Sequence, residues 1–231
     1  MEHGLKDKVA IVTAASRGLG RERLHAKVIA VARGESELGE LAAAFPGHCI
    51  PLVGDLRDPD LPQRAVERAL ALFGTLDIVV ANTAGPPSML PLEAKESDVA
   101  SAFDTVFYPA FRLIQAATRP MLERRHGRIV IVSSTSIKAP KPFLCLSAAS
   151  RSALWAWAKS AAPQLFESGI TINAVLAGPH DTERARQLGV KNKPMGRPDD
   201  FGAFVTFLAG EHARFITGTG HMVDGGEFTG V

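Results

Sequence analysis

Short apolar runs rich in valine and isoleucine alternate along the chain with longer segments of helical periodicity. The apolar runs have the length of buried strands: Val9–Thr13, Val28–Ala32, His48–Val53, Ile78–Asn82, Ile129–Ser133, Ile170–Val175 and Met222–Val223. The helical segments are Leu61–Phe73, Asp98–Glu123, Ser147–Phe166 and Asp199–Ala209. Strands that alternate with helices indicate βαβ units, so the pattern predicts an α/β protein with a doubly wound parallel sheet in three layers, α/β/α.

The connection between the first two predicted strands is short. Only 13 residues separate Thr13 from Lys27, close to the minimum of about a dozen for a parallel crossover. Residues 21–26 leave a first helix of about two turns with almost no apolar face. Either the fold is locally weak here or residues are absent from the chain, and we favour the second explanation.

Composition and charge narrow the class of protein. The 231 residues, 46% of them hydrophobic, are enough for one domain spanning 1–231 with a large core. The net charge is only +2, and we interpret the basic run at residues 123–128 as a solvated helix end, so no nucleic-acid partner is expected. Cys49 and Cys145 lack metal-ligand spacing, which predicts no metal site and a reduced, cytoplasmic compartment. No apolar stretch approaches the ~18 residues of a membrane span.

In an open parallel sheet the ligand site is built by loops at the carboxyl ends of the strands. The first predicted strand continues into Thr13-Ala14-Ala15-Ser16-Arg17-Gly18-Leu19-Gly20. Glycines let the backbone approach a diphosphate closely, and the N–H groups of the next helix favour an anion. The loop therefore predicts a dinucleotide phosphate site at 16–20.

These residues resemble the short-chain dehydrogenase/reductase family, of the single-domain Rossmann type, and most closely its 3-oxoacyl-carrier-protein-reductase-like members with atypical motifs. The similarity runs from Lys8 to Gly226. The family loop Thr-Gly-x-x-x-Gly-x-Gly maps onto this chain with Ala14 in place of the first glycine. The resemblance implies an NAD(P)-dependent oxidoreductase that acts on a small carbonyl compound or a secondary alcohol.

The resemblance also implies a set of cofactor contacts. Asp55 stands where the family aspartate meets the adenine edge, Ala84 replaces a family glycine after Asn82, and the segment from Gly178 to Thr182 resembles the loop that grips the nicotinamide amide. The full set is Thr13, Ser16, Arg17, Gly18, Leu19, Gly20, Arg33, Asp55, Leu56, Asn82, Ala84, Arg151, Gly178, Pro179 and Thr182.

The choice of dinucleotide depends on the end of the second strand. A carboxylate there would accept a ribose hydroxyl and repel a 2′-phosphate, but this chain has Arg33, with Arg17 in the glycine loop. Guanidinium groups bind phosphate in a bidentate manner. We therefore predict NADP(H), with NAD(H) as the alternative.

The catalytic set departs from the family pattern of Ser, Tyr-x-x-x-Lys and Asn. The register places Ser134 at the family serine, Ser147 at the tyrosine, Arg151 at the lysine and Val106 at the asparagine. The one tyrosine, Tyr108, lies on the preceding helix and no shift of register brings it into the motif. An aliphatic hydroxyl is a weaker acid than a phenol, so catalysis through Ser134, Ser147 and Arg151 is expected to lose about 10²–10⁴ in rate.

Two functions of different classes therefore remain open. The favoured one is an NADP-dependent oxidoreductase, and the other is a dinucleotide-binding or scaffold protein that has lost the chemistry. A hydrolase built on Ser147, His180 and Asp181 is set aside because no nucleophile elbow precedes the serine. The resemblance implies a homodimer or homotetramer, and the short segment after Thr182 predicts a small substrate lid. The substrate itself stays open.

Overall fold

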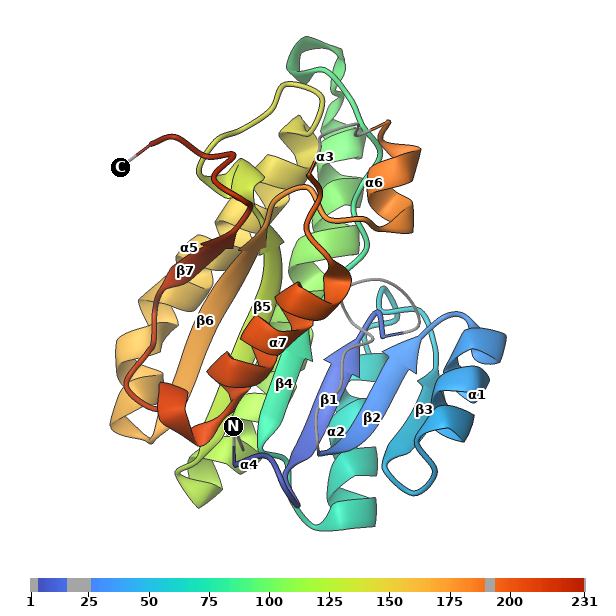
Figure 1. Ribbon diagram of the computed structural model, residues 1–231, viewed down its shortest axis with the longest axis vertical. Helices are drawn as coiled ribbons and strands as arrows, with labels where there is room; N and C mark the ends of the chain where they lie inside the picture. The colour runs from blue at the N-terminus through green and yellow to red at the C-terminus, as the bar shows by residue number, and fades with distance from the viewer. Residues whose placement is uncertain (1–3, 16–25, 190–193, 231) are drawn as a thin grey trace.

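Seven parallel strands form one sheet in the order β3-β2-β1-β4-β5-β6-β7 (Figure 1). The computed structural model describes residues 4–15, 26–189 and 194–230. The strands are β1 Val9–Thr13, β2 Lys27–Ala32, β3 Cys49–Val53, β4 Ile78–Ala81, β5 Gly127–Ser134, β6 Ile170–Ala177 and β7 Gly220–Val223. Each predicted strand is present, with ends shifted by up to two residues, and the predicted doubly wound parallel sheet is confirmed.

Helices cover both faces of the sheet. In Figure 1, α7 (Pro198–Ala209) lies in front, while α2 (Leu61–Phe73), α4 (Tyr108–Arg124) and α5 (Cys145–Glu167) lie behind. Strand side chains alternate between two separate cores: Ile129 and Ile131 of β5 pack toward α4 and α5, and Val130 and Val132 pack toward α7. Both faces are buried, which is why these strands are continuously apolar.

Two helical regions differ from the sequence prediction. Helix α1 (Glu35–Ala44) was not predicted because only Leu38 and Leu41 are buried on it, too few for a clear apolar stripe. The segment expected as one helix over 98–123 is α3 (Glu96–Ala102), a π-helical turn at Phe103–Phe107, and then α4. A single π-helical turn changes the spacing of the apolar side chains only slightly. The hydrophobic pattern of the sequence therefore reads as one continuous helix.

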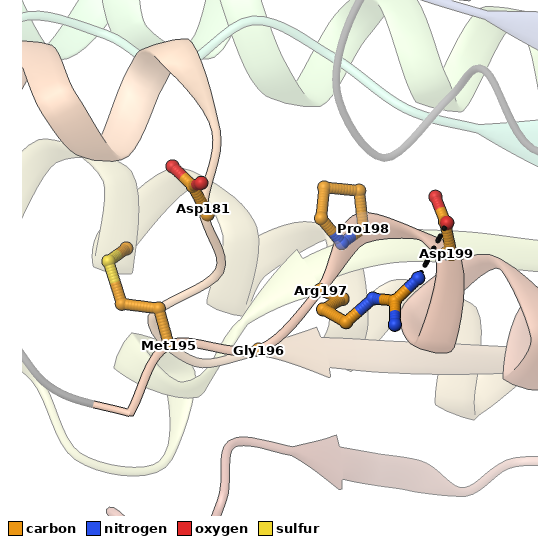
Figure 2. Close-up of a pocket in the computed structure, with 6 residues that line it drawn as sticks. All are labelled: Asp181, Met195, Gly196, Arg197, Pro198 and Asp199. Carbon is orange, nitrogen blue, oxygen red and sulfur yellow. Dashed lines mark hydrogen bonds and ion pairs between the residues drawn. The ribbon is translucent and has the colours of Figure 1, made fainter.

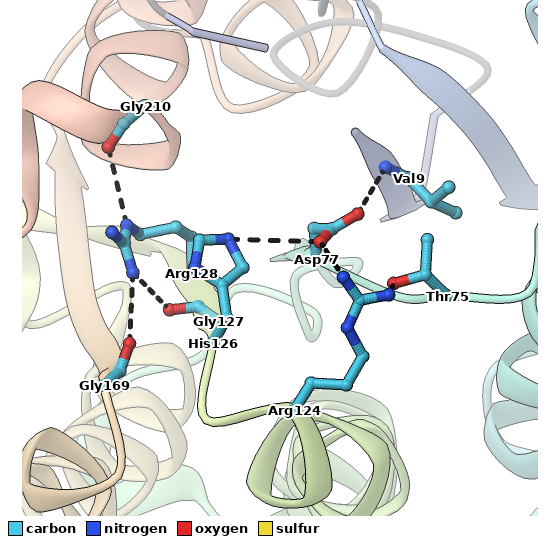
Figure 3. Close-up of polar contacts among 9 residues, drawn as sticks. All are labelled: Val9, Thr75, Asp77, Arg124, His126, Gly127, Arg128, Gly169 and Gly210. Carbon is cyan, nitrogen blue, oxygen red and sulfur yellow. Dashed lines mark hydrogen bonds and ion pairs between the residues drawn. The ribbon is translucent and has the colours of Figure 1, made fainter. Parts of the chain in front are cut away.

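The basic run at the end of α4 is exposed at residues 123–125, as the interpretation of a solvated helix end expects, but it is buried at Gly127 and Arg128. Figure 3 shows the polar contacts of this region. Arg128 is 6% exposed and donates to the carbonyl oxygens of Gly127 (2.9 Å), Gly169 (3.3 Å) and Gly210 (3.4 Å). Buried Asp77 accepts a hydrogen bond from the backbone N–H of Val9 at 3.0 Å. The arginine and the aspartate join segments that are distant in sequence.

The same carboxylate of Asp77 also faces an arginine at the end of α4 and a histidine in the turn after it. Arg124 Nη2 lies 3.8 Å and His126 Nε2 3.9 Å from Asp77 Oδ1. The charges at this end of the sheet thus hold the fold together, at the edge opposite to the carboxyl ends of the strands.

Some sequence predictions fall outside the described residues. These are the phosphate-loop contacts at Ser16, Arg17, Gly18, Leu19 and Gly20, together with the short first helix. Within the described part of the chain, no helix is both long enough and apolar enough to cross a membrane.

Candidate active site

A cavity of about 560 Å³ opens at the carboxyl edge of the sheet. The loops after β4, β5 and β6 line it, together with the first turns of α5 and α6 (Glu183–Gln187), which lies beyond the strand ends in Figure 1. The cavity brings together most of the sequence-predicted residues that the structure describes: Arg33, Asn82, Ala84, Ser134, Ser147, Arg151, Gly178, Pro179 and Thr182. Residues from five separate segments therefore converge as the parallel topology requires.

Three of the predicted cofactor residues do not line this cavity. The Thr13 hydroxyl donates to the carbonyl oxygen of Asn82 at 2.7 Å and accepts from its N–H at 2.9 Å, so it clamps the end of β1 to that of β4. Asp55 is held by Arg57, whose Nη2 lies 2.7 Å from Oδ2, and this hydrogen bond lowers the pKa of the carboxyl group. Leu56 packs against the core next to it.

Ser134 ends β5 and caps the 3-10 turn at Thr135–Ile137. Its Oγ accepts the backbone N–H of Ser136 at 3.2 Å. Because the oxygen is engaged as an acceptor, the hydroxyl hydrogen is free to point elsewhere. Within the described residues no acceptor engages this hydrogen.

Ser147 and Arg151 lie one turn apart at the start of α5. Arg151 Nε donates to Ser147 Oγ at 3.2 Å, Nη1 to the carbonyl oxygen of Val132 at 3.0 Å, and Nη2 to that of Thr83 at 3.5 Å. The guanidinium thus fastens α5 to the ends of β4 and β5. Burial, followed by the charge of Arg184, lowers the pKa of Arg151 to about 10.

The hydroxyl groups of Ser147 and Ser134 share the same hydrogen-bonding pattern. Each oxygen already accepts an N–H, and in the part of the chain that the structure describes neither O–H group has an acceptor. Two O–H donors that line one cavity can both bind a single oxygen atom of a ligand. This arrangement is suited to a carbonyl or alkoxide oxygen.

The positions that carry the family asparagine and the sole tyrosine contribute nothing polar to this cavity. Val106 is fully buried in the π-helical turn. Tyr108 is 40% exposed, and its ring packs against Phe107 and the guanidinium of Arg112.

A Ser-His-Asp arrangement is not assembled. His180 Nδ1 lies 3.1 Å from the carbonyl oxygen of Gly178, and its ring packs edge-on against Phe201. Asp181 pairs with Arg186 at 2.5 Å on the surface. With the aspartate turned to another partner, no described carboxylate orients the histidine, and the geometry gives no support to a hydrolase.

A second hollow of about 410 Å³ lies beside α6, where Asp181, Met195, Gly196, Arg197, Pro198 and Asp199 line it (Figure 2). Figure 2 shows that Arg197 turns to Asp199, with Nη2 3.2 Å from Oδ2. Both side chains are more than half exposed. Exposed, mutually paired charges make a poor binding site, so the larger cavity is the candidate active site.

Sequence reasoning missed several residues that line the candidate active site, among them Ser133, Ser136 and Arg184. Ser133 and Ser136 border the cavity but are only 6% and 1% exposed. Their hydroxyl oxygens are buried and have no hydrogen-bond partner among the described residues. Arg184 of α6 also lines the cavity. Both serines lie within two residues of Ser134, so their proximity to the site could have been predicted from the sequence. The position of Arg184 could not, because it depends on how α6 folds over the cavity.

The described residues fit the nicotinamide end of a dinucleotide. A Cβ at Gly178 would lie 2.5 Å from that of Asp224, so the loop after β6 needs glycine to approach β7. Arg151 and the hydroxyls of Ser134 and Ser147 offer donors for a ribose or an amide. Arg33 follows β2 at the rim, where it is exposed and within range to lower the pKa of Asp55.

Comparison with known proteins covers nearly the whole chain. Residues 13–227 match a family model described as enoyl-(acyl carrier protein) reductase. L-rhamnose 1-dehydrogenase (NAD(P)(+)) of Azotobacter vinelandii is 33% identical over 250 residues, which cover 97% of this chain and 98% of that protein. The 3-oxoacyl-(acyl-carrier-protein) reductase FabG of Escherichia coli K12 is 31% identical over 237 residues, covering 96% and 97%.

Solved structures share the fold at lower sequence identity. YwfH, an NADPH-dependent reductase involved in bacilysin biosynthesis, superposes with a TM-score of 0.91 at 23% identity, covering 98% of this chain and 100% of that one. L-sorbose reductase from Gluconobacter frateurii, solved with NADPH and L-sorbose, gives a TM-score of 0.91 at 23% identity and covers 100% of both chains.

Proposed function

The chain belongs to the short-chain dehydrogenase/reductase family, and from this premise we propose that it is an oxidoreductase that uses NADP(H). Its substrate is a small carbonyl compound or the corresponding secondary alcohol. The relatives above 30% identity, a dehydrogenase named for NAD(P)+ and a 3-oxoacyl reductase, support this reaction type. The observation that carries the proposal is the pair of free O–H donors on Ser134 and Ser147 in one cavity.

The preference for NADP(H) rests on charge. Arg33 is the first residue after β2, and no carboxylate occupies that strand end. A guanidinium there favours a 2′-phosphate, and a carboxylate would repel it. The contacts at Arg17 and in the rest of the phosphate loop stay predictions from the sequence.

Arg151 and the loop from Gly178 to Thr182 would hold the nicotinamide, which would supply the hydride for reduction of the carbonyl carbon. The hydroxyls of Ser134 and Ser147 donate hydrogen bonds to the carbonyl oxygen and hold it as negative charge develops there. The Ser147 O–H passes its proton to that oxygen and regains one from water. Arg151 positions Ser147 through Nε and stabilises the charge that the serine oxygen carries during the transfer.

The second candidate is a dinucleotide-binding protein without catalytic activity. The observation that favours it is the absence of a phenol from the described lining of the cavity, because Tyr108 lies outside. Loss of the general acid alone lowers the rate by about 10²–10⁴, and a rate reduced by that factor is still measurable. The two candidates can therefore be distinguished by an assay for slow turnover.

Fluorescence titration with NADPH and NADH, followed by a screen of simple ketones and β-keto esters, tests the proposal. We expect NADPH to bind more tightly than NADH, and Arg33→Asp to reverse that order. Turnover of a ketone by the NADPH complex supports the oxidoreductase. Tight binding without turnover of any carbonyl supports the second candidate, and binding of neither nucleotide overturns both.

We also propose a homodimer or homotetramer. Apolar side chains on α4 and α5 support an assembly through these helices, since Tyr108, Leu122 and Phe166 are each about two-fifths exposed. Light scattering coupled to size exclusion measures the mass, and a monomer at micromolar concentration contradicts this proposal.

A further inference from the structure

Two guanidinium groups face the candidate active site without a carboxylate partner in the described part of the chain. Arg151 donates only to carbonyl oxygens and to Ser147, and Arg184 donates to the carbonyl oxygen of Pro86 at 2.7 Å. The acids that line the cavity have other described partners: Glu227 pairs with Lys141 at 2.6 Å, and Glu183 accepts from Gln187.

The two cations also repel one another. Burial lowers the pKa of both, and the charge of Arg184 lowers that of Arg151 further. A buried cation without a counterion is costly, and a bound anion offsets that cost. The interior of the cavity therefore favours a negatively charged ligand group.

Of the two, Arg184 has more unengaged donors for such a group. The three nitrogens of Arg151 are each engaged, whereas only Nη2 of Arg184 has an acceptor within the described residues. Helix α6, which carries Arg184, is capped at its start: the hydroxyl oxygen of Thr182 accepts a hydrogen bond from the N–H of Ala185 at 3.2 Å. A Cβ at Gly85 would lie 3.2 Å from Nη2, so glycine leaves room for the guanidinium against the loop.

We propose that Arg184 binds a carboxylate of the substrate, so that the protein acts on small oxo acids or hydroxy acids. This inference rests on the proposed function, because the reacting carbon must lie beside Ser134 and Ser147. A guanidinium binds a carboxylate through two parallel N–H donors.

Matched substrates test the assignment in the NADPH-loaded protein. The probes are 4-oxopentanoate and its methyl ester, which lacks the negative charge and carries one additional methyl group. We expect kcat/KM to favour the acid by about 10- to 100-fold, chiefly through KM, and Arg184→Gln to reduce that ratio to near one. Arg184→Lys retains part of the preference. Arg186→Gln is the control, since this exposed residue of α6 pairs with Asp181.

Calorimetric binding of 4-oxopentanoate, with and without NADPH, separates this inference from the proposed function. Loss of carboxylate binding in Arg184→Gln, with an unchanged Kd for NADPH, supports the inference even when turnover is undetectable. An unchanged preference and unchanged carboxylate binding in Arg184→Gln overturn it. If Arg184→Gln weakens only NADPH, the guanidinium serves a cofactor phosphate and the inference is also overturned.

Discussion

Nε of Arg151 donates a hydrogen bond across 3.2 Å to Oγ of Ser147, four residues earlier on α5. The spacing of one helical turn places both side chains on the same face. The bond leaves the hydroxyl hydrogen of Ser147 free and holds its oxygen beside a buried positive charge. The pair thus keeps the geometry of a proton donor with a neighbouring cation, although each residue type differs from the family pattern.

Removing the hydroxyl of Ser147 is expected to slow hydride transfer with little effect on cofactor binding. Loss of one preorganised donor to a developing oxyanion costs about 10²–10³ in kcat. Ser147→Ala should show this loss in the NADPH-dependent reduction of a ketone. Ser160→Ala, on the exposed side of the same helix, is the matched control. Equal rates for Ser147→Ala and the control would rule out the role of Ser147.

Restoring the family pair should accelerate the reaction. Ser147→Tyr with Arg151→Lys introduces a phenol beside an ammonium group, which lowers the pKa of the phenol and makes it a better acid. We expect kcat to rise by about 10²–10⁴ over the native protein. Near-UV circular dichroism checks that the cavity accommodates the ring. A folded double variant with no gain in rate contradicts the account of the missing acid.

Most of the strands and helices could be predicted from the sequence, whereas only part of the candidate active site could. The strands were predictable because burial on both faces makes them uninterrupted apolar runs, as in β5. The π turn and α1 were not, since neither produces a strong stripe. The proximity of Arg184 and Arg151 was not predictable, because it depends on how helix α6 lies over the start of helix α5 in the fold.

Ala14 carries backbone strain at the end of β1. Its φ is 48°, in the left-handed region that glycine adopts more readily, and the family has glycine at this position. Ala14→Gly should raise the free energy of unfolding by about 1 kcal/mol and the Tm by about 2–4 °C. Ala71→Gly in α2 is the control, which should be destabilising. A lower Tm for Ala14→Gly would show that the strain is not relieved.

Stability should fall on mild acidification, in part through His126. Burial, followed by the charge of Lys8, lowers the pKa of His126 in the folded state. Between about pH 7 and pH 5 the unfolded chain therefore binds a proton at this position that the folded protein does not, and the free energy of unfolding decreases. Burial lowers the pKa of His221 as well, and its contribution has the same sign.

Urea denaturation at about pH 7.5 and about pH 5.5 measures this effect. His126→Gln should flatten the pH dependence, and the double variant with His221→Gln should flatten it more. A pH dependence as steep in the double variant as in the native protein would show that other groups govern it.

The most direct test of the central claim is a single turnover with NADPH that carries deuterium on the transferring face of C4. The account predicts that the label appears on the carbinol carbon of the product, and that Ser134→Ala with Ser147→Ala slows its transfer by at least about 100-fold while NADPH still binds. If the native protein binds NADPH but transfers no label, or if the double variant transfers it at the native rate, the two hydroxyls are not the catalytic donors.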